Sequence, residues 1–258
     1  MPACAFRRGP TANWIVFCFR CLQPMRPHCK CMRPKARAVV YTKDMQSISR
    51  TFTLSTLTLL AASALFGQYK AEPAGPPPSD VPANFASLLV KNGTKIVGAN
   101  GSAVCSIWLR TEEPKGPKST EESVTLPLIP QGSFLGVLQL PVAGADRRGQ
   151  SLKPGIYTLR YSDYPVNGDH QGVAPQRDFM LLTPIADDKD PAATPNFDAL
   201  VAMSRKASGT PHPAVLSIWN QDTDFQPGLS LQGDHDWVLQ TKLGTAQLGI
   251  ILIGKVEQ

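Results

Sequence analysis

Residues 153–161 read KPGIYTLRY, and this stretch decides the fold class of the chain. A Pro-Gly pair marks a turn, and the side chains after it alternate between two faces, as they do in a β-strand. Tyr157, Leu159 and Tyr161 share one face, and the residues between them, including Arg160, share the other. We therefore predict a strand that directs its tyrosines and leucine into the core.

Short apolar runs separated by Gly, Pro, Asn and Asp continue this pattern on both sides, which is typical of antiparallel β-proteins. Asn92-Gly93 favours a two-residue hairpin, because both residues accept a positive φ. Alternation within 103–110 places Cys105 with apolar neighbours on one strand face. We predict further strands at 86–91, 94–99, 103–110, 123–129, 133–140, 178–183, 214–219, 237–242 and 247–256. The fold class is mainly β: an antiparallel β-sandwich, of jelly-roll or immunoglobulin/transthyretin-like type.

One short helix is predicted near 195–207. Thr194 can cap its beginning, Pro195 suits its first position, and Gly209 lies just beyond its end. Its apolar stripe consists of Phe197, Leu200, Val201 and Ser204.

Residues 153–159 resemble the P-x-G-x-Y-x-L beginning of a strand in several secreted bacterial β-sandwich families. Some of these families are uncharacterised, and others are transthyretin-like or carboxypeptidase-regulatory-like modules. The resemblance implies that Gly155 permits a tight turn and that Tyr157 and Leu159 fill the core. It covers about seven residues and implies no catalytic residue.

The charge of the chain is concentrated in its first quarter. Residues 1–68 contain ten Lys and Arg against one acid, a net charge of +9, whereas residues 69–258 contain sixteen against nineteen, a net charge of −3. The chain from 69 onward therefore has no positive field for nucleic acid, and we expect no nucleic-acid partner. No run of 18 apolar residues exists, which excludes a protein with several membrane-spanning helices.

Residues 45–68 have the pattern of a secretory signal peptide. Arg50 supplies the positive beginning, 51–61 form the apolar region, and Ala62-Ser63-Ala64 suits cleavage by a signal peptidase. A membrane anchor and a buried core helix are the alternatives. We predict a secreted or periplasmic protein without an integral membrane span after cleavage.

The domain organisation follows from this signal. Residues 1–44 are interpreted as a disordered, non-native extension upstream of the true start at Met45. The alternative is a targeting or metal-binding appendage built on Cys18-x-x-Cys21 and the cysteines after it. A Pro-rich linker is predicted at 69–83 and the β-sandwich domain at 84–258.

The loop at 162–177 is the best predicted interaction site, because loops of this length are often functional. Its candidate ligand-binding residues combine aromatic, amide and charged groups that suit an envelope glycan or protein: Tyr164, Asn167, Asp169, His170 and Arg177. A solvated hairpin connection is the alternative.

A divalent metal ion is the alternative cofactor to none at all. Three histidines and an acid in predicted loops are candidate ligands: His170, His212, His235 and Asp234. Ordinary turn chemistry explains the same Gly-Asp-His tripeptides, and no dense ligand spacing such as HExxH is present.

No catalytic residue is assigned from the sequence. Cys105 is interpreted as a buried, inert thiol, and no G-x-S-x-G motif supports a serine nucleophile. The first hypothesis is a non-catalytic binding or accessory module of the bacterial cell envelope. A metal-binding protein and an enzyme acting on envelope polysaccharide stay open beside it.

Overall fold

The computed structural model describes residues 6–8, 14–16, 69–163 and 177–255. The chain divides into two units, Met1–Thr56 and Leu57–Gln258, and each is described by itself. In the first unit, β1 (Phe6–Arg8) pairs antiparallel with β2 (Trp14–Val16). The rest of 1–68, including the predicted signal peptide, lies outside the described residues.

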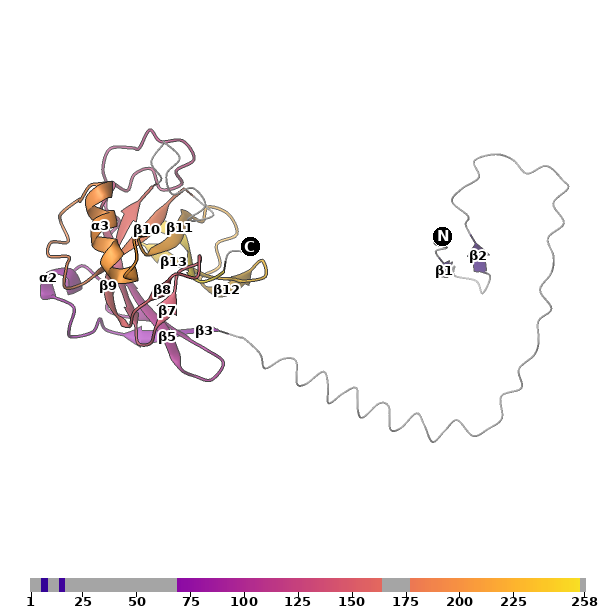
Figure 1. Ribbon diagram of the computed structural model, residues 1–258. Helices are drawn as coiled ribbons and strands as arrows, with labels where there is room; N and C mark the ends of the chain where they lie inside the picture. The colour runs from indigo at the N-terminus through magenta and orange to yellow at the C-terminus, as the bar shows by residue number, and fades with distance from the viewer. Residues whose placement is uncertain (1–5, 9–13, 17–68, 164–176, 256–258) are drawn as a thin grey trace. The chain divides into compact units, whose positions relative to one another are not determined.

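The second unit is built around one ten-stranded antiparallel sheet (Figure 1). From one edge to the other, its strands are β12 (Gly228–Gln232), β13 (Asp236–Leu243), β14 (Ala246–Ile253), β11 (Val215–Asn220), β10 (Phe179–Pro184), β9 (Gly155–Ser162), β6 (Phe134–Leu140), β5 (Ala103–Leu109), β4 (Gly93–Val97) and β3 (Lys70–Gly75). A separate pair is formed by β7 (Gly144–Ala145) and β8 (Ser151–Leu152).

The two end strands, β12 and β3, come into contact, so the sheet nearly closes into a barrel. The prediction of a mainly β, antiparallel protein is confirmed. The finer prediction of a two-layered sandwich is not, because these strands follow one another in a single continuous sheet rather than in two. Sequence alternation gives the buried face of each strand but does not say which strands share a sheet.

The inner face of the curved sheet holds the main apolar core. Alternate residues of nine strands meet there, among them Ile96, Ile107, Leu159, Met180 and Ile250. Two smaller clusters lie on the outer face, one under helix α3 and one beside helix α2. Both faces of the central strands are therefore buried.

Strand β9 carries the residues that the sequence singled out. Tyr157, Leu159 and Tyr161 are buried in the main core, as predicted. Thr158 and Arg160 on the opposite face are also fully buried, at 0 % exposure. The segment after β10 covers them and supplies Asp188, itself 3 % exposed.

All five N–H groups of the Arg160 guanidinium donate hydrogen bonds in this covered site. Nε donates to Asp188 Oδ2 and Nη2 donates to Asp188 Oδ1, both at 2.7 Å. Nη2 also donates to the Asp190 carbonyl, and Nη1 donates to the carbonyls of Gly132 and Ala193. The buried charge is therefore both neutralised and fully hydrogen-bonded.

Helix α3 (Phe197–Ser208) confirms the predicted helix, but its cap is different. The Asn196 side chain accepts from the Ala199 N–H at 2.9 Å, so Asn196 is the N-cap in place of Thr194. Gly209 ends the helix with φ 67°, a left-handed conformation that favours glycine. In Figure 1, α3 lies across β9 and β10, with which its residues are in contact.

The segment 69–83, predicted as a linker, belongs largely to the folded unit. Lys70–Gly75 forms strand β3, and Val81 is 5 % exposed. The four-residue helix α2 (Ala83–Ala86) follows and buries Phe85. Proline content suggested a linker, but an edge strand tolerates proline as well.

Asn92-Gly93 does not form the predicted hairpin. Gly93 lies in β4, where a Cβ would come within 2.5 Å of the Trp108 ring, and Asn92 Oδ1 accepts from the Gly75 N–H. Glycine is needed here for close packing of the indole rather than for a turn. The predicted strands at 86–91 and 123–129 are also absent from the structure, whereas those predicted at 237–242 and 247–256 are present as β13 and β14 and pair with each other around Gly244.

Replacing Asp188 with asparagine is predicted to destabilise the protein by about 3–5 kcal/mol, because it leaves the buried charge of Arg160 without a counter-charge. Its neighbour Asp187 provides the matched control, since it pairs with Lys206 at a site where the lysine side chain is 60 % exposed. Asp187→Asn is expected to cost less than about 1 kcal/mol. Urea unfolding measures both, and equal losses would contradict the importance of the buried pair.

Candidate functional site

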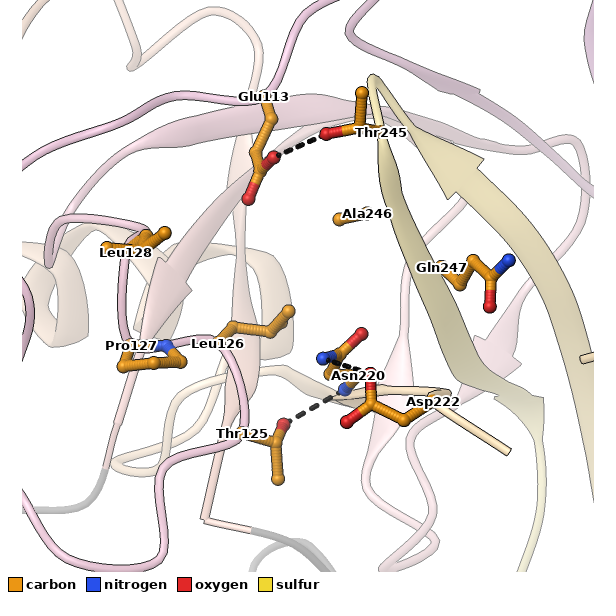
Figure 2. Close-up of a pocket in the computed structure, with 10 residues that line it drawn as sticks. All are labelled: Glu113, Thr125, Leu126, Pro127, Leu128, Asn220, Asp222, Thr245, Ala246 and Gln247. Carbon is orange, nitrogen blue, oxygen red and sulfur yellow. Dashed lines mark hydrogen bonds between the residues drawn. The ribbon is translucent and has the colours of Figure 1, made fainter.

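The candidate functional site is a pocket of about 380 Å³ between the ends of β11 and β14 and the loop between β5 and β6. Figure 2 shows its lining, which combines two carboxylates, two amides and two hydroxyls with an apolar side. The lining residues are Glu113, Thr125, Leu126, Pro127, Leu128, Asn220, Asp222, Thr245, Ala246 and Gln247.

The loop side of the pocket is held in shape by main-chain bonds. The Gly116 N–H donates to the Leu128 carbonyl, and the Ser119 N–H donates to the Pro127 carbonyl. The β13–β14 turn packs closely against the same loop, since a Cβ on Gly244 would lie 2.7 Å from the Glu113 nitrogen. Position 244 needs glycine for a second reason: Gly244 has a φ of 58°, a left-handed conformation that favours glycine.

Two carboxylates approach the pocket from opposite ends (Figure 2). Glu113 accepts from the Thr245 hydroxyl at 3.3 Å through Oε2, and Asp222 accepts from Asn220 Nδ2 at 2.7 Å through Oδ1. Each carboxylate thus uses one oxygen in these bonds and has a second oxygen for a ligand. No Lys or Arg is among the lining residues, so the lining carries a formal charge of −2.

Asp178 fixes the wall of the pocket from inside the protein. This residue is 0 % exposed and accepts four hydrogen bonds. Oδ2 accepts from the Thr125 N–H and hydroxyl, both at 2.8 Å, and Oδ1 accepts from the Leu126 N–H at 3.1 Å and the Tyr161 hydroxyl at 2.6 Å. Burial, followed by the charge of Asp178, raises the pKa of Tyr161, so this hydroxyl keeps its proton to donate.

The bonds continue from Asp178 into the pocket. The Thr125 hydroxyl, which donates to Asp178, also accepts from the Asn220 N–H at 3.0 Å. Asn220 in turn donates to Asp222. A chain of hydrogen bonds therefore connects Tyr161 in the core with a carboxylate of the pocket.

The predicted ligand-binding loop lies mostly outside the described residues, which exclude Tyr164, Asn167, Asp169 and His170. Arg177 at its end is described. Its Nη2 donates to Glu121 Oε2 at 2.7 Å, and its Nη1 donates to the Glu122 carbonyl. The structure thus ties Arg177 to the loop that forms the pocket wall, and its ligand-binding role stays a prediction.

The metal hypothesis is likewise not decided by the geometry. Within the part of the chain that the structure describes, no three His, Cys, Asp or Glu side chains gather as metal ligands do. His212 lies between α3 and β11, and Asp234 and His235 lie in the β12–β13 turn, but His170 is outside the described residues. Metal binding by this set stays a prediction.

Cys105 is buried in the main core, as the sequence suggested. Burial raises the pKa of its thiol from 9.0 to about 12. At neutral pH the side chain is therefore a protonated, apolar group rather than a nucleophile.

No protein-family model matches the chain, and no curated protein or solved structure matches it either. The resemblance of 153–159 to secreted modules stays a prediction on its residues alone. Pro154 directly precedes Gly155, one residue closer than in the P-x-G-x-Y-x-L motif.

Among the described residues, no helix has the length and apolar character needed to cross a membrane.

The sequence analysis did not identify the pocket residues. Glu113 and Thr125 lie in a loop that has no motif, and Asn220 and Asp222 follow a strand as ordinary polar residues do. The available signal was the position of Asn220 and Gln247 at the ends of two strands that pair with each other. Strand pairing was unknown from the sequence, so their proximity was as well.

Replacing Asp178 with asparagine is predicted to destabilise the protein by at least about 2 kcal/mol, because an amide cannot accept from four donors and brings two donors of its own. Tyr161→Phe removes a single donor and serves as the milder comparison, with an expected loss of about 1 kcal/mol. Thermal and urea unfolding measure both variants. An Asp178→Asn protein as stable as Tyr161→Phe would show that the four bonds contribute little.

Proposed function

We propose that the protein is an exported, non-catalytic binding module of the bacterial cell envelope. Its pocket between β11, β14 and the β5–β6 loop binds the end of a neutral or amine-bearing glycan. The observation that carries this proposal is the lining of that pocket, in which acceptor oxygens and amides surround a small apolar side.

The lining favours ligands that donate hydrogen bonds. Glu113 and Asp222 accept hydrogen bonds from hydroxyl or ammonium groups, and the Asn220 amide can both donate and accept hydrogen bonds. Leu126, Pro127 and neighbouring apolar groups offer a surface for the C–H face of a sugar ring. The two negative charges disfavour phosphate, sulfate and carboxylate groups.

Export rests on the signal-peptide pattern of 45–68 and on the charge contrast around it. The resemblance of 153–159 to secreted β-sandwich modules supports the same location.

The enzyme hypothesis draws on one further observation, the presence of carboxylates at both ends of one pocket. Glycoside hydrolysis commonly uses two such groups, one on each side of the bond that is cleaved.

Asp222→Asn is predicted to lower the affinity for an amine-bearing sugar about five- to tenfold, because a charge-assisted hydrogen bond becomes a neutral one. Asp224→Asn is the matched control, since Asp224 is exposed, does not line the pocket and has a φ of 53°, which asparagine tolerates. Titration calorimetry with glucosamine- and glucose-terminated oligosaccharides measures the effect. Absence of binding to either sugar by the unaltered protein would contradict the proposal.

The same titrations separate the binding and enzyme hypotheses. A non-catalytic module returns each oligosaccharide intact, whereas a hydrolase releases new reducing ends. Loss of that release in both Glu113→Gln and Asp222→Asn would establish catalysis by the pair.

Export is predicted to produce a mature chain that begins between residues 65 and 69, after cleavage near Ala62-Ser63-Ala64. Expression of the full chain in a bacterium, followed by fractionation and N-terminal sequencing, checks this. Arg50→Glu is expected to slow export, because it removes the positive beginning of the signal. An uncleaved cytoplasmic product would contradict the proposed location.

A further inference from the structure

The sheet has a seam where β12 and β3 meet without forming a ladder. These strands are in contact, but no backbone pairing joins them among the described strands. One end of the seam is closed by Tyr69 and Trp237, whose rings meet edge to face with centroids 5.3 Å apart. Trp237 lies opposite Leu231 near the end of β12.

The seam opens away from this aromatic contact. A pocket of about 470 Å³ lies between the part of β3 around Pro73 and the beginning of β12 at Gly228. Because Gly228 pairs with Gln240, the last residues of β13 have no neighbour on this side among the described strands. The pocket is lined by Ala71, Glu72, Pro73, Asn92, Gly93, Thr94, Phe225, Pro227, Gly228, Leu239, Gln240, Thr241 and Lys242.

Among the described strands, none pairs with the edge of β3 that faces this pocket. A proline in an edge strand takes the position whose N–H side faces away from the sheet. Pro73 thereby sets the alternation of β3, so Ala71 also directs its N–H and C=O toward the seam. Both residues line the pocket. They offer one donor and two acceptors to a chain that lies beside β3.

Gln240 supplies a further polar group from the other side. It is 7 % exposed, and its Oε1 accepts from the Gln226 N–H at 2.7 Å. Within the described part of the chain its Nε2 donates no hydrogen bond, which leaves an amide donor in the pocket wall. The seam pocket therefore contains hydrogen-bonding groups on two sides.

The charges of the seam pocket select an acidic ligand. Glu72 is neutralised by Lys95 at 3.0 Å. Lys242 lies 6.0 Å from the centre of the Phe225 ring, and no carboxylate among the described residues pairs with it. The pocket thus carries one uncompensated positive charge beside an aromatic ring, in contrast to the negative pocket at β11 and β14.

We propose that the seam pocket binds an extended, acidic segment of another protein, which lies along the open edge of β3 with its carboxylate at Lys242. Main-chain bonds to Ala71 and Pro73 hold the segment in the manner of an added strand. Gln240 and Phe225 contact it from the opposite side. This inference uses residues that the proposed glycan site does not share, so either can fail alone.

Titration calorimetry of the full-length protein with two blocked hexapeptides tests the proposal. One has the sequence TVDVTV, and the other has Lys in place of Asp. The acidic peptide is expected to bind about two- to fivefold more tightly, which corresponds to one exposed charge pair. Lys242→Gln is expected to remove the difference, and Lys118→Gln, an exposed lysine outside the pocket, is expected to keep it.

Binding of neither peptide, equal binding of both, or a difference that survives Lys242→Gln would each overturn the proposal. Sedimentation of the unaltered protein as a dimer that Lys242→Gln dissociates would also overturn it, since the occupant would then be a second copy. Amide exchange slowed at Ala71 by the acidic peptide is the expected signature of strand addition, and a folded Gln240→Leu protein should lose affinity for both peptides.

Discussion

The guanidinium of Arg160 connects more of the folded unit than any single apolar contact described above. It holds Asp188 and two carbonyls of the segment before α3, and it also holds Gly132 in front of β6. Its carbon lies 5.9 Å from the centre of the Phe134 ring, which packs edge to face on Phe85 of α2. Since a buried charge is tolerated only when it is paired and hydrogen-bonded, these segments have to fold together.

A second buried charge, that of Asp178, connects this scaffold to the candidate site. Asp178 directly precedes β10 and Arg160 lies in the neighbouring strand β9, yet they serve opposite faces of the sheet. Arg160 fastens the outer covering, whereas Asp178 fastens Thr125 and Leu126 in the pocket wall. The pocket wall is therefore supported by a fully hydrogen-bonded carboxylate, which reduces the conformational entropy that the wall residues lose when a ligand binds.

The curvature of the sheet places the two pockets. Ten antiparallel strands bring the end strands into contact without a ladder between them, so an opening remains between β3 and β12. The other pocket lies where β11 and β14 end beneath the β5–β6 loop. Their charges differ in sign: in the first, Glu72 is paired with Lys95 and Lys242 has no carboxylate paired with it among the described residues, whereas the second has Glu113 and Asp222 without a cation in its lining. The two sites consequently suit different partners.

The sequence by itself determined the mainly β character, the inward faces of β5 and β9 and the helix that ends at Gly209, because these depend on alternation and local caps. It did not reveal that Thr158 and Arg160 are buried, since only the covering by Asp188, 28 residues beyond Arg160, makes that possible. For the same reason it assigned Gly93 to a turn, although Trp108 is what requires a glycine there. Strand order, the seam and the assembly of Glu113, Thr125 and Asp222 in one pocket were decided by tertiary structure, because pairing between distant strands has no signature in local sequence.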